Sequence, residues 1–318
     1  EQRRPSVEER RDQKACRYRK AGKCGQYRRS RIQLGSSALR GYPGGRSEEG
    51  KSGMRGCLQR RVGSGEREAL AKEADAVVFV VGYNHDDEGE FISEDQSENY
   101  IGSMGGDRKK SLGLHEDEVK LLQEVGPVND KSTVVLIGGN MIMMTEWYDK
   151  VNAVIMAYYP GMEGGTALAE IIYGDVNPSG KLPYVVPYSE DDLPHVDWEA
   201  TDQYYEYYHG YTRLEKNGVK PLVPYGFGLS YTTFDITDPK AVVDGDELKV
   251  TVNVKNTGAI DGDEVVQVYV GFENSAVDRP VKQLRGFRRV SLKAGGRKKK
   301  LRSQLRWKKL KWYDPVLS

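Results

Sequence analysis

Residues 76–82 read AVVFVVG, a continuous apolar run that ends in glycine. A short run without alternation, closed by a turn residue, is typical of a strand that is buried on both faces of a parallel sheet. Two more runs of the same kind follow along the chain, TVVLI at 133–137 and AVIMA at 153–157. The sequence therefore predicts a sheet that contains at least these three strands.

The segments between these runs carry helix signals. Residues 114–125 place apolar side chains at helical intervals and end before Pro127, residues 141–148 are also predicted to be helical, and residues 160–174 open with a glycine-rich turn and continue as a helix. Since strands and helices alternate, we expect a doubly wound, mainly parallel α/β domain over residues 68–231.

The pattern changes to all-β near residue 232. The strings LKVTVNV at 248–254 and VVQVYV at 265–270 alternate with period two, and turn signals such as Asp244–Gly245 lie around them. Short strands at this spacing predict an antiparallel sandwich over residues 232–318.

The net charge of the chain is nearly zero, but its distribution is uneven. The 318 residues hold 48 basic and 47 acidic side chains. Residues 1–67 carry 19 basic and 7 acidic side chains, residues 285–311 carry 13 basic and none acidic, and residues 68–284 carry 16 basic and 39 acidic. The strongly acidic central part would repel phosphates, so nucleic-acid binding is disfavoured.

No stretch of the sequence has the roughly 18 apolar residues of a membrane helix. The N-terminal arginines have no apolar stretch behind them, so we see no signal peptide, and the compartment stays open. The only cysteines, Cys16, Cys24 and Cys57, form no disulfide framework or zinc pattern, and we expect no metal or cofactor.

The two basic ends fit poorly with the rest of the chain. Residues 1–67 show almost no periodicity, so no core-facing stripe can be drawn. Either these ends bind acidic polymers, or they are translated in the wrong reading frame. Codons for residues 14–50, read one base later, permit a strand-like string, and those for 296–309, read two bases later, permit an alternating strand. We favour the frameshift, and expect residues 1–67 to be poorly ordered and the sheet to lack its first strand or fill that place badly.

Five strings stand out along the chain: GGDRKKSL at 105–112, GMEGG at 161–165, GDVNPSGKLP at 174–183, PYGFGLSYTTF at 224–234 and KWYDP at 311–315. Taken in this order and spacing, they resemble the C-terminal half of glycoside hydrolase family 3, the β-glucosidase-type enzymes.

The resemblance implies a three-part enzyme for β-glucosides or oligosaccharides. Its N-terminal barrel carries an aspartate nucleophile, its α/β domain completes the active site, and a fibronectin-III-like domain often follows. This chain resembles the second and third parts only. We therefore expect the barrel to be a missing partner, the isolated chain to be inactive, and the fibronectin-III-like sandwich to be incomplete, with one sheet edge open.

A retaining glycosidase needs a nucleophilic carboxylate and a second carboxyl group that protonates the leaving oxygen. In the family the second often lies in a Glu-Gly-x-Asp-Arg string, but residues 103–108 read SMGGDR, so Met104 stands where the glutamate would be. We expect Glu88 or Glu90 to be the acid/base, since residues 86–90 follow the strand AVVFVVG; Glu94 and Glu98 are weaker candidates. The alternative is a merely solvated acidic loop.

The same loop offers three candidates for substrate binding, His85, Asp107 and Arg108. Each has a plainer alternative: His85 as a surface residue, and Asp107 with Arg108 as an ion pair that braces the loop. His115 is expected to cap a helix.

The tyrosines at 204, 205, 207, 208 and 211 could stack on sugars, although packing is favoured. Three functions stay open: a fragment of a β-glycosidase, which we favour, a non-catalytic carbohydrate-binding or interaction module, and a nucleic-acid-binding protein.

Overall fold

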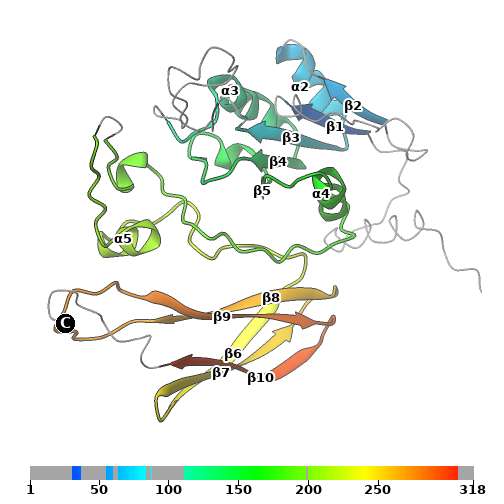
Figure 1. Ribbon diagram of the computed structural model, residues 1–318. Helices are drawn as coiled ribbons and strands as arrows, with labels where there is room; N and C mark the ends of the chain where they lie inside the picture. Colours follow the sequence, from blue (N-terminus) through cyan, green and yellow to red (C-terminus); the bar gives the residue numbers. More distant parts are fainter. Residues whose placement is uncertain are drawn as a thin grey trace, which may run out of the picture. The chain divides into compact units, whose positions relative to one another are not determined.

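The computed structural model (Figure 1) describes residues 31–36, 55–59, 64–83, 87, 111–197 and 200–306. The chain divides into two compact units. The first, here called the sandwich unit, comprises residues 1–22, 166–185 and 205–318, and the second, the α/β unit, comprises residues 23–165 and 186–204.

The α/β unit is built on a parallel sheet of five strands in the order β2-β1-β3-β4-β5 (Figure 1). The three predicted apolar runs form its strands β3, β4 and β5, which confirms the α/β prediction. The strands are β1 (Arg31–Ser36), β2 (Arg55–Gln59), β3 (Ala76–Gly82), β4 (Ser132–Ile137) and β5 (Ala153–Tyr158).

Helices pack beside this sheet. In the α/β unit, α2 (Ser64–Glu73) contacts α3 (Glu116–Val125), and α3 continues into the 3-10 helix η3 (Gly126–Val128). Leu122 of α3 is fully buried, as are Val134 and Val135 of β4, so the apolar runs form the core of the unit. The remaining helices are η4 (Tyr148–Lys150), α4 (Gly164–Ile172), η5 (Glu190–Asp192) and α5 (Gly210–Lys216).

One predicted helix is wrong. Residues 141–148 form turns that lead into η4, although Ile142, Met144 and Trp147 are buried. The Met143 N–H donates to the carbonyl of Leu112 at 2.8 Å. Burial of this segment therefore comes with backbone pairing to a distant part of the chain, which helical periodicity cannot anticipate.

We predicted that the sheet lacks its first strand or fills that place badly, and the first of these alternatives is wrong, because a strand occupies the place beside β3. Strand β1 pairs in parallel with β3, from Ile32 opposite Ala76 to Ser36 opposite Val80, and β2 pairs with β1. Helix α2 begins at Ser64, before the boundary that we expected at residue 67. Backbone hydrogen bonds form a ladder irrespective of side-chain pattern, so a segment without periodicity can occupy the edge of β3. The frameshift hypothesis stays a prediction that the coding DNA would decide.

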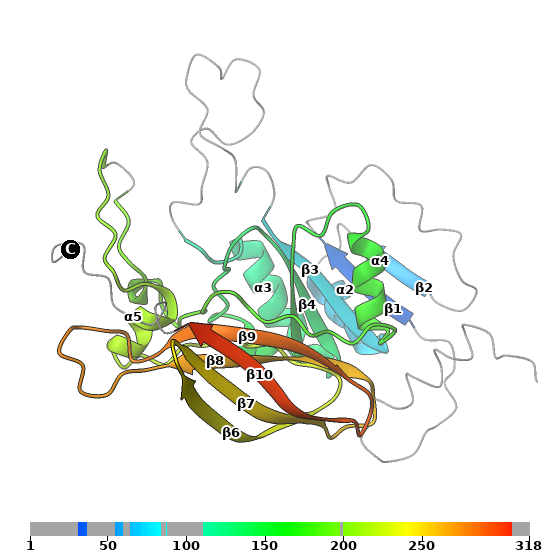
Figure 2. The same ribbon diagram turned by 60° about the horizontal axis from the view of Figure 1, so that its bottom comes forward.

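The sandwich unit contains the predicted antiparallel strands (Figure 2). One sheet has the order β10-β7-β6 and the other pairs β8 with β9. The core between them contains five buried side chains, Val252, Val254, Val266, Val290 and Leu292. The strands are β6 (Phe234–Asp244), β7 (Glu247–Asn256), β8 (Gly262–Val270), β9 (Gln283–Leu292) and β10 (Arg297–Arg306). The prediction that the sandwich is incomplete with one sheet edge open concerns its C-terminal end, and residues 307–318 lie outside the described residues.

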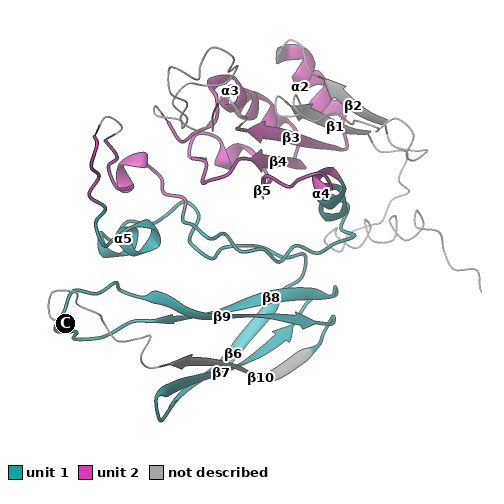
Figure 3. Cartoon of the chain, viewed as in Figure 1, with its two compact units in different colours: residues 1–22, 166–185, 205–318 teal, residues 23–165, 186–204 magenta. Residues whose placement is uncertain are grey.

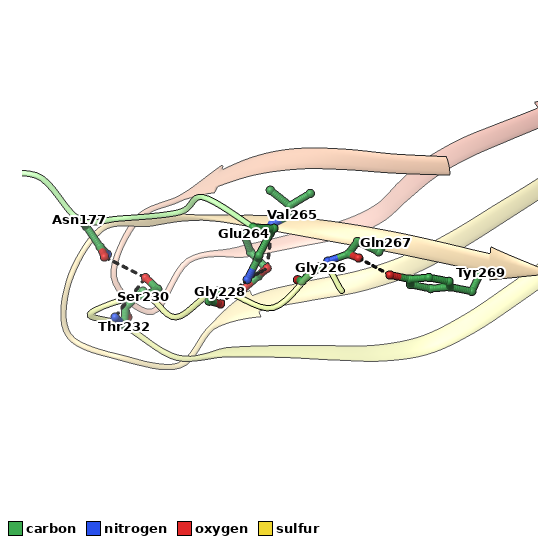
Figure 4. A network of polar contacts seen from close by, with 10 residues as sticks. Asn177, Gly226, Gly228, Ser230, Thr232, Glu264, Val265, Gln267 and Tyr269 are labelled. Carbon is green, nitrogen blue, oxygen red and sulfur yellow. Dashed lines mark hydrogen bonds and ion pairs between the residues drawn. The ribbon is translucent and has the colours of Figure 1, made fainter. Parts of the chain in front are cut away.

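The sandwich unit also includes two irregular segments, residues 175–185 and 224–232, coloured with the sandwich in Figure 3. Polar contacts join them to the strands (Figure 4). Lys181 donates to the carbonyl of Gly228 at 2.7 Å and pairs with Glu264 of β8 at 2.9 Å, and both charged side chains are largely buried. The Lys181–Glu264 ion pair thus connects residues on the two sides of the predicted boundary near residue 232. Because both side chains are largely buried, solvent screens their attraction only weakly.

Asparagine side chains complete this connection. Asn177 accepts from the Ser230 hydroxyl at 2.9 Å and donates to the carbonyl of Asp261 at 3.0 Å. Asn256, which is fully buried, accepts from the Thr232 hydroxyl at 2.7 Å. These contacts satisfy polar groups that would otherwise be costly to bury.

Candidate active-site edge of the α/β sheet

The carboxyl ends of β3, β4 and β5 lie at one edge of the sheet, where α/β proteins place their functional loops. The long acidic segment of residues 84–110 follows β3 at this edge. Within it the structure describes only Asp87. The predicted acid/base residues Glu88 and Glu90, the weaker candidates Glu94 and Glu98, and the predicted substrate-binding residues His85, Asp107 and Arg108 lie outside the described residues.

Gly82 ends β3 in a conformation that requires glycine. Its φ is +136°, and a Cβ atom there would lie 1.9 Å from the carbonyl oxygen of Ile137 in β4. The N–H of the next residue, Tyr83, donates to that same oxygen at 2.8 Å. The glycine therefore allows the chain to leave the sheet while it still contacts the neighbouring strand.

Tyr83 joins the two ends of the long loop. Its side chain is buried, and its hydroxyl lies 2.6 Å from the carbonyl oxygen of Leu112 and 3.1 Å from that of Gly113. A phenol has one proton, so the two carbonyls share one donor. Tyr83 and Leu112, which flank the acidic segment in the sequence, are therefore hydrogen-bonded to each other at this sheet edge.

Asp87 and His115 form a second connection between the two ends. The Nε2 atom of His115 lies 2.9 Å from Oδ1 and 3.1 Å from Oδ2 of Asp87. The Asp87 side chain is only 7% exposed, whereas that of His115 is 42% exposed. His115 is the N-cap of α3, which confirms the capping prediction, and its imidazole also contacts Asp87.

Glu118 makes the contacts that hold the start of α3. Its side chain is 3% exposed, Oε1 accepts from the N–H of Gly82 at 3.2 Å, and Oε2 lies 3.4 Å from the backbone nitrogen of His115. A carboxylate in the first turn of a helix also interacts favourably with the helix dipole. One buried carboxylate thus ties the end of β3 to the beginning of α3.

We expect Glu118→Ala to lower the free energy of unfolding by about 1–3 kcal/mol, because the buried N–H of Gly82 loses its acceptor. Glu118→Gln keeps an acceptor oxygen and should cost less. Glu116→Ala, in the same helical turn, is the matched control and should change stability little. Urea denaturation of the three variants measures these differences, and equal midpoints for Glu118→Ala and the parent would contradict the assignment.

Two further features lie at this sheet edge. Glu190 of η5 accepts from the N–H of Leu112 at 2.8 Å and from the hydroxyl of Ser111 at 3.0 Å. Tyr158 ends β5 with a φ of +54°, a conformation that is strained for a residue with a side chain. Backbone strain of this kind is often found at functional sites. Tyr158 lies at the carboxyl end of β5, at the same edge of the sheet as the ends of the acidic loop.

Over the part of the chain that the structure describes, no cluster of three or more His, Cys, Asp or Glu could hold a metal ion. No described helix is long and apolar enough to cross a membrane.

The predicted tyrosine cluster contains both packed and exposed rings. Tyr208 is 8% exposed, and Tyr211 packs against Tyr225 with ring centroids 4.6 Å apart. Tyr204, Tyr205 and Tyr207 are exposed. Packing thus accounts for only part of the cluster.

Comparison with known proteins identifies the class and then the family. A family model described as the glycosyl hydrolase family 3 C-terminal domain matches residues 18–231, and one described as a fibronectin type III-like domain matches residues 264–318. The α/β domain and the sandwich are therefore those of a glycoside hydrolase. The chain belongs to glycosyl hydrolase family 3. The match begins at residue 18, before residue 68, where we expected the α/β domain to begin.

Its relatives include several β-glucosidases. The chain is 38% identical over 205 residues to thermostable β-glucosidase B of Acetivibrio thermocellus, covering 62% of this chain and 27% of that protein. It is 33% identical over 267 residues to β-glucosidase BoGH3A of Bacteroides ovatus, covering 79% and 34%. A crystal structure of a Bifidobacterium adolescentis family 3 β-glucosidase superimposes with a TM-score of 0.73 at 26% identity, covering 91% and 45%. The chain thus spans about a third of the length of these curated relatives.

Proposed function

We propose that this chain is the part of a retaining β-glucosidase that supplies the acid/base, acting with a barrel domain that supplies the nucleophile. Support comes from the family, from the names of the relatives and from the acidic segment at the carboxyl end of β3. The observation that carries the proposal is the anchoring of this segment: Tyr83 contacts Leu112, and Asp87 contacts His115. Groups that act in catalysis need such fixed supports.

In the proposed mechanism, Glu88 or Glu90 protonates the glycosidic oxygen while the barrel's carboxylate attacks the anomeric carbon. The same glutamate, now ionised, then deprotonates the water that hydrolyses the glycosyl-enzyme. Both candidates lie within three residues of Asp87, whose carboxylate pairs with His115. Met104 cannot donate a proton. His85, Asp107 and Arg108 are proposed to bind the hydroxyls of the sugar.

The proposal predicts that the purified chain does not hydrolyse aryl β-glucosides, because it lacks the nucleophile. When the chain is joined to the barrel domain of a family 3 β-glucosidase, activity should appear. The matched control is the same fusion with both Glu88→Ala and Glu90→Ala, which should be much less active. Turnover by the chain alone that is lost on replacing one of its own carboxylates would reveal an internal nucleophile and overturn the proposal.

A further inference from the structure

A second group of side chains that could bind a ligand lies in the sandwich unit and is here called the tyrosine platform. It consists of Tyr205, Tyr207, Tyr208, Lys216, Asp278 and Gln283. They come from the segment before α5, from α5 itself, and from the connection between β8 and β9 with the start of β9. Nothing in the proposed mechanism uses these residues.

The ring of Tyr207 is held in place although it is 48% exposed. It meets the ring of Tyr208 edge-on, with centroids 5.1 Å apart and an interplanar angle of 82°. Its hydroxyl accepts from Nε2 of Gln283 at 3.3 Å. Contacts at the ring and at the hydroxyl restrict rotation of the Tyr207 side chain before any ligand binds. The side chain therefore loses little further conformational entropy when a ligand stacks on it.

Tyr208 forms the support below. Its side chain is buried, its hydroxyl donates to Oδ1 of Asp278 at 2.8 Å, and Lys216 lies 3.7 Å from its ring centroid. Burial, followed by the bond to Asp278, raises the pKa of Tyr208 to about 12. Hydrogen bonds from Lys216 and then from Tyr208 lower the pKa of Asp278. At neutral pH the support therefore remains a neutral phenol that donates to a carboxylate.

The rim of the platform is polar and of both signs. Lys216 pairs with Oδ2 of Asp278 at 2.8 Å, and their side chains are 45% and 70% exposed. A sugar hydroxyl both donates and accepts, so this ion pair offers a partner for each role. Tyr205, two residues before Tyr207, is 65% exposed. An apolar ring face with a donor and an acceptor at its rim matches the surface of a glucose unit in β-linkage, whose ring faces carry only C–H groups.

We propose that the tyrosine platform binds β-linked gluco-oligosaccharides by stacking on Tyr207, at a site separate from the acid/base loop. This binding goes beyond the proposed function, since it needs neither the loop nor hydrolysis. A protein partner or a second copy of the chain is the competing occupant, because exposed aromatic and charged side chains are also common at protein interfaces.

The test is calorimetric titration of the full chain with cellopentaose, with maltopentaose as the α-linked comparison. We expect saturable binding of cellopentaose and weaker binding of maltopentaose. Tyr207→Ala should weaken cellopentaose binding by about tenfold, which is near the lower end of the loss measured when an aromatic ring that stacks on a nucleic-acid base is replaced by alanine. Tyr207→Phe keeps the ring and should bind nearly as the parent does.

Two controls isolate the platform. Phe287→Ala removes another exposed aromatic ring of the same unit and should leave binding unchanged. The double variant Glu88→Ala/Glu90→Ala should also bind normally, so a failure of the catalytic proposal would leave this one standing. Thermal melting shows whether Tyr207→Ala remains folded. If the parent chain does not bind cellopentaose, or if folded Tyr207→Ala binds equally well, the proposal is overturned. It is equally overturned if Tyr207→Ala alters only the sedimentation of the chain and not its binding, which would assign the platform to self-association.

Discussion

Replacing the true acid/base by alanine is expected to slow hydrolysis of alkyl β-glucosides by about 100- to 10,000-fold in the complete enzyme, the usual contribution of a positioned proton donor. Poor leaving groups need that proton, whereas an activated aryl leaving group departs without it. Glu88→Ala and Glu90→Ala should therefore be compared on an alkyl and on a dinitrophenyl glucoside. The variant that removes the acid/base will show a loss that depends strongly on the leaving group.

Rescue of turnover by azide is a second, independent test for loss of the acid/base. In the variant that lacks the base, azide should restore part of the turnover by attacking the glycosyl-enzyme without proton transfer. Glu94→Ala and Glu98→Ala, in the same loop, serve as comparison variants and should show neither effect. If Glu88→Ala and Glu90→Ala both hydrolyse the two substrates in the parental ratio, the acid comes from elsewhere and the loop only covers the site.

Gly82→Ala is expected to destabilise the chain by more than about 4 kcal/mol, a large part of the 5–15 kcal/mol that typically stabilises a domain. The added Cβ would lie 1.9 Å from the carbonyl oxygen of Ile137, and the φ of +136° is unfavourable for any residue with a side chain. The obstacle is backbone in a buried sheet, so it cannot move aside as a flexible side chain could.

Gly165→Ala is the matched control for this change. Gly165 lies in α4, and a Cβ there would meet no atom within 4 Å. Alanine favours helices over glycine, so this variant should be as stable as the parent or slightly more stable. Urea denaturation followed by circular dichroism compares the three proteins. An unfolding midpoint for Gly82→Ala equal to that of the parent would show that the end of β3 rearranges easily, against the packing described here.

The architecture could be predicted from the sequence because the pattern of apolar residues along a strand reflects which of its faces is buried. Strands β3 and β4 bury side chains on both faces, so their residues are continuously apolar. Strand β7 alternates because one of its faces, with Val252 and Val254, points toward the core of the sandwich. The order and spacing of the five family strings indicated the class of enzyme, which the family models confirm.

The site could be predicted only in part. The acidic segment was located because it follows a buried strand and is too long for a simple connection. The Asp87–His115 pair, the buried Glu118 and the hydroxyl of Tyr83 gave no such signal, because their partners lie up to 36 residues away. In the sequence, Glu118 looks like an ordinary surface residue at the start of a helix.

The sequence by itself thus determined five of the strands, β3, β4, β5, β7 and β8, the change to an all-β pattern near residue 232, and the family that the chain resembles. The tertiary structure alone decided that residues 31–36 join the sheet, that residues 141–148 are not a helix, and that both ends of the acidic loop are fixed at one edge. The physical reason is the range of the forces. Burial of one or both faces of an element produces a pattern of apolar residues along the sequence. A hydrogen bond between two polar side chains depends instead on where the folded chain brings them together.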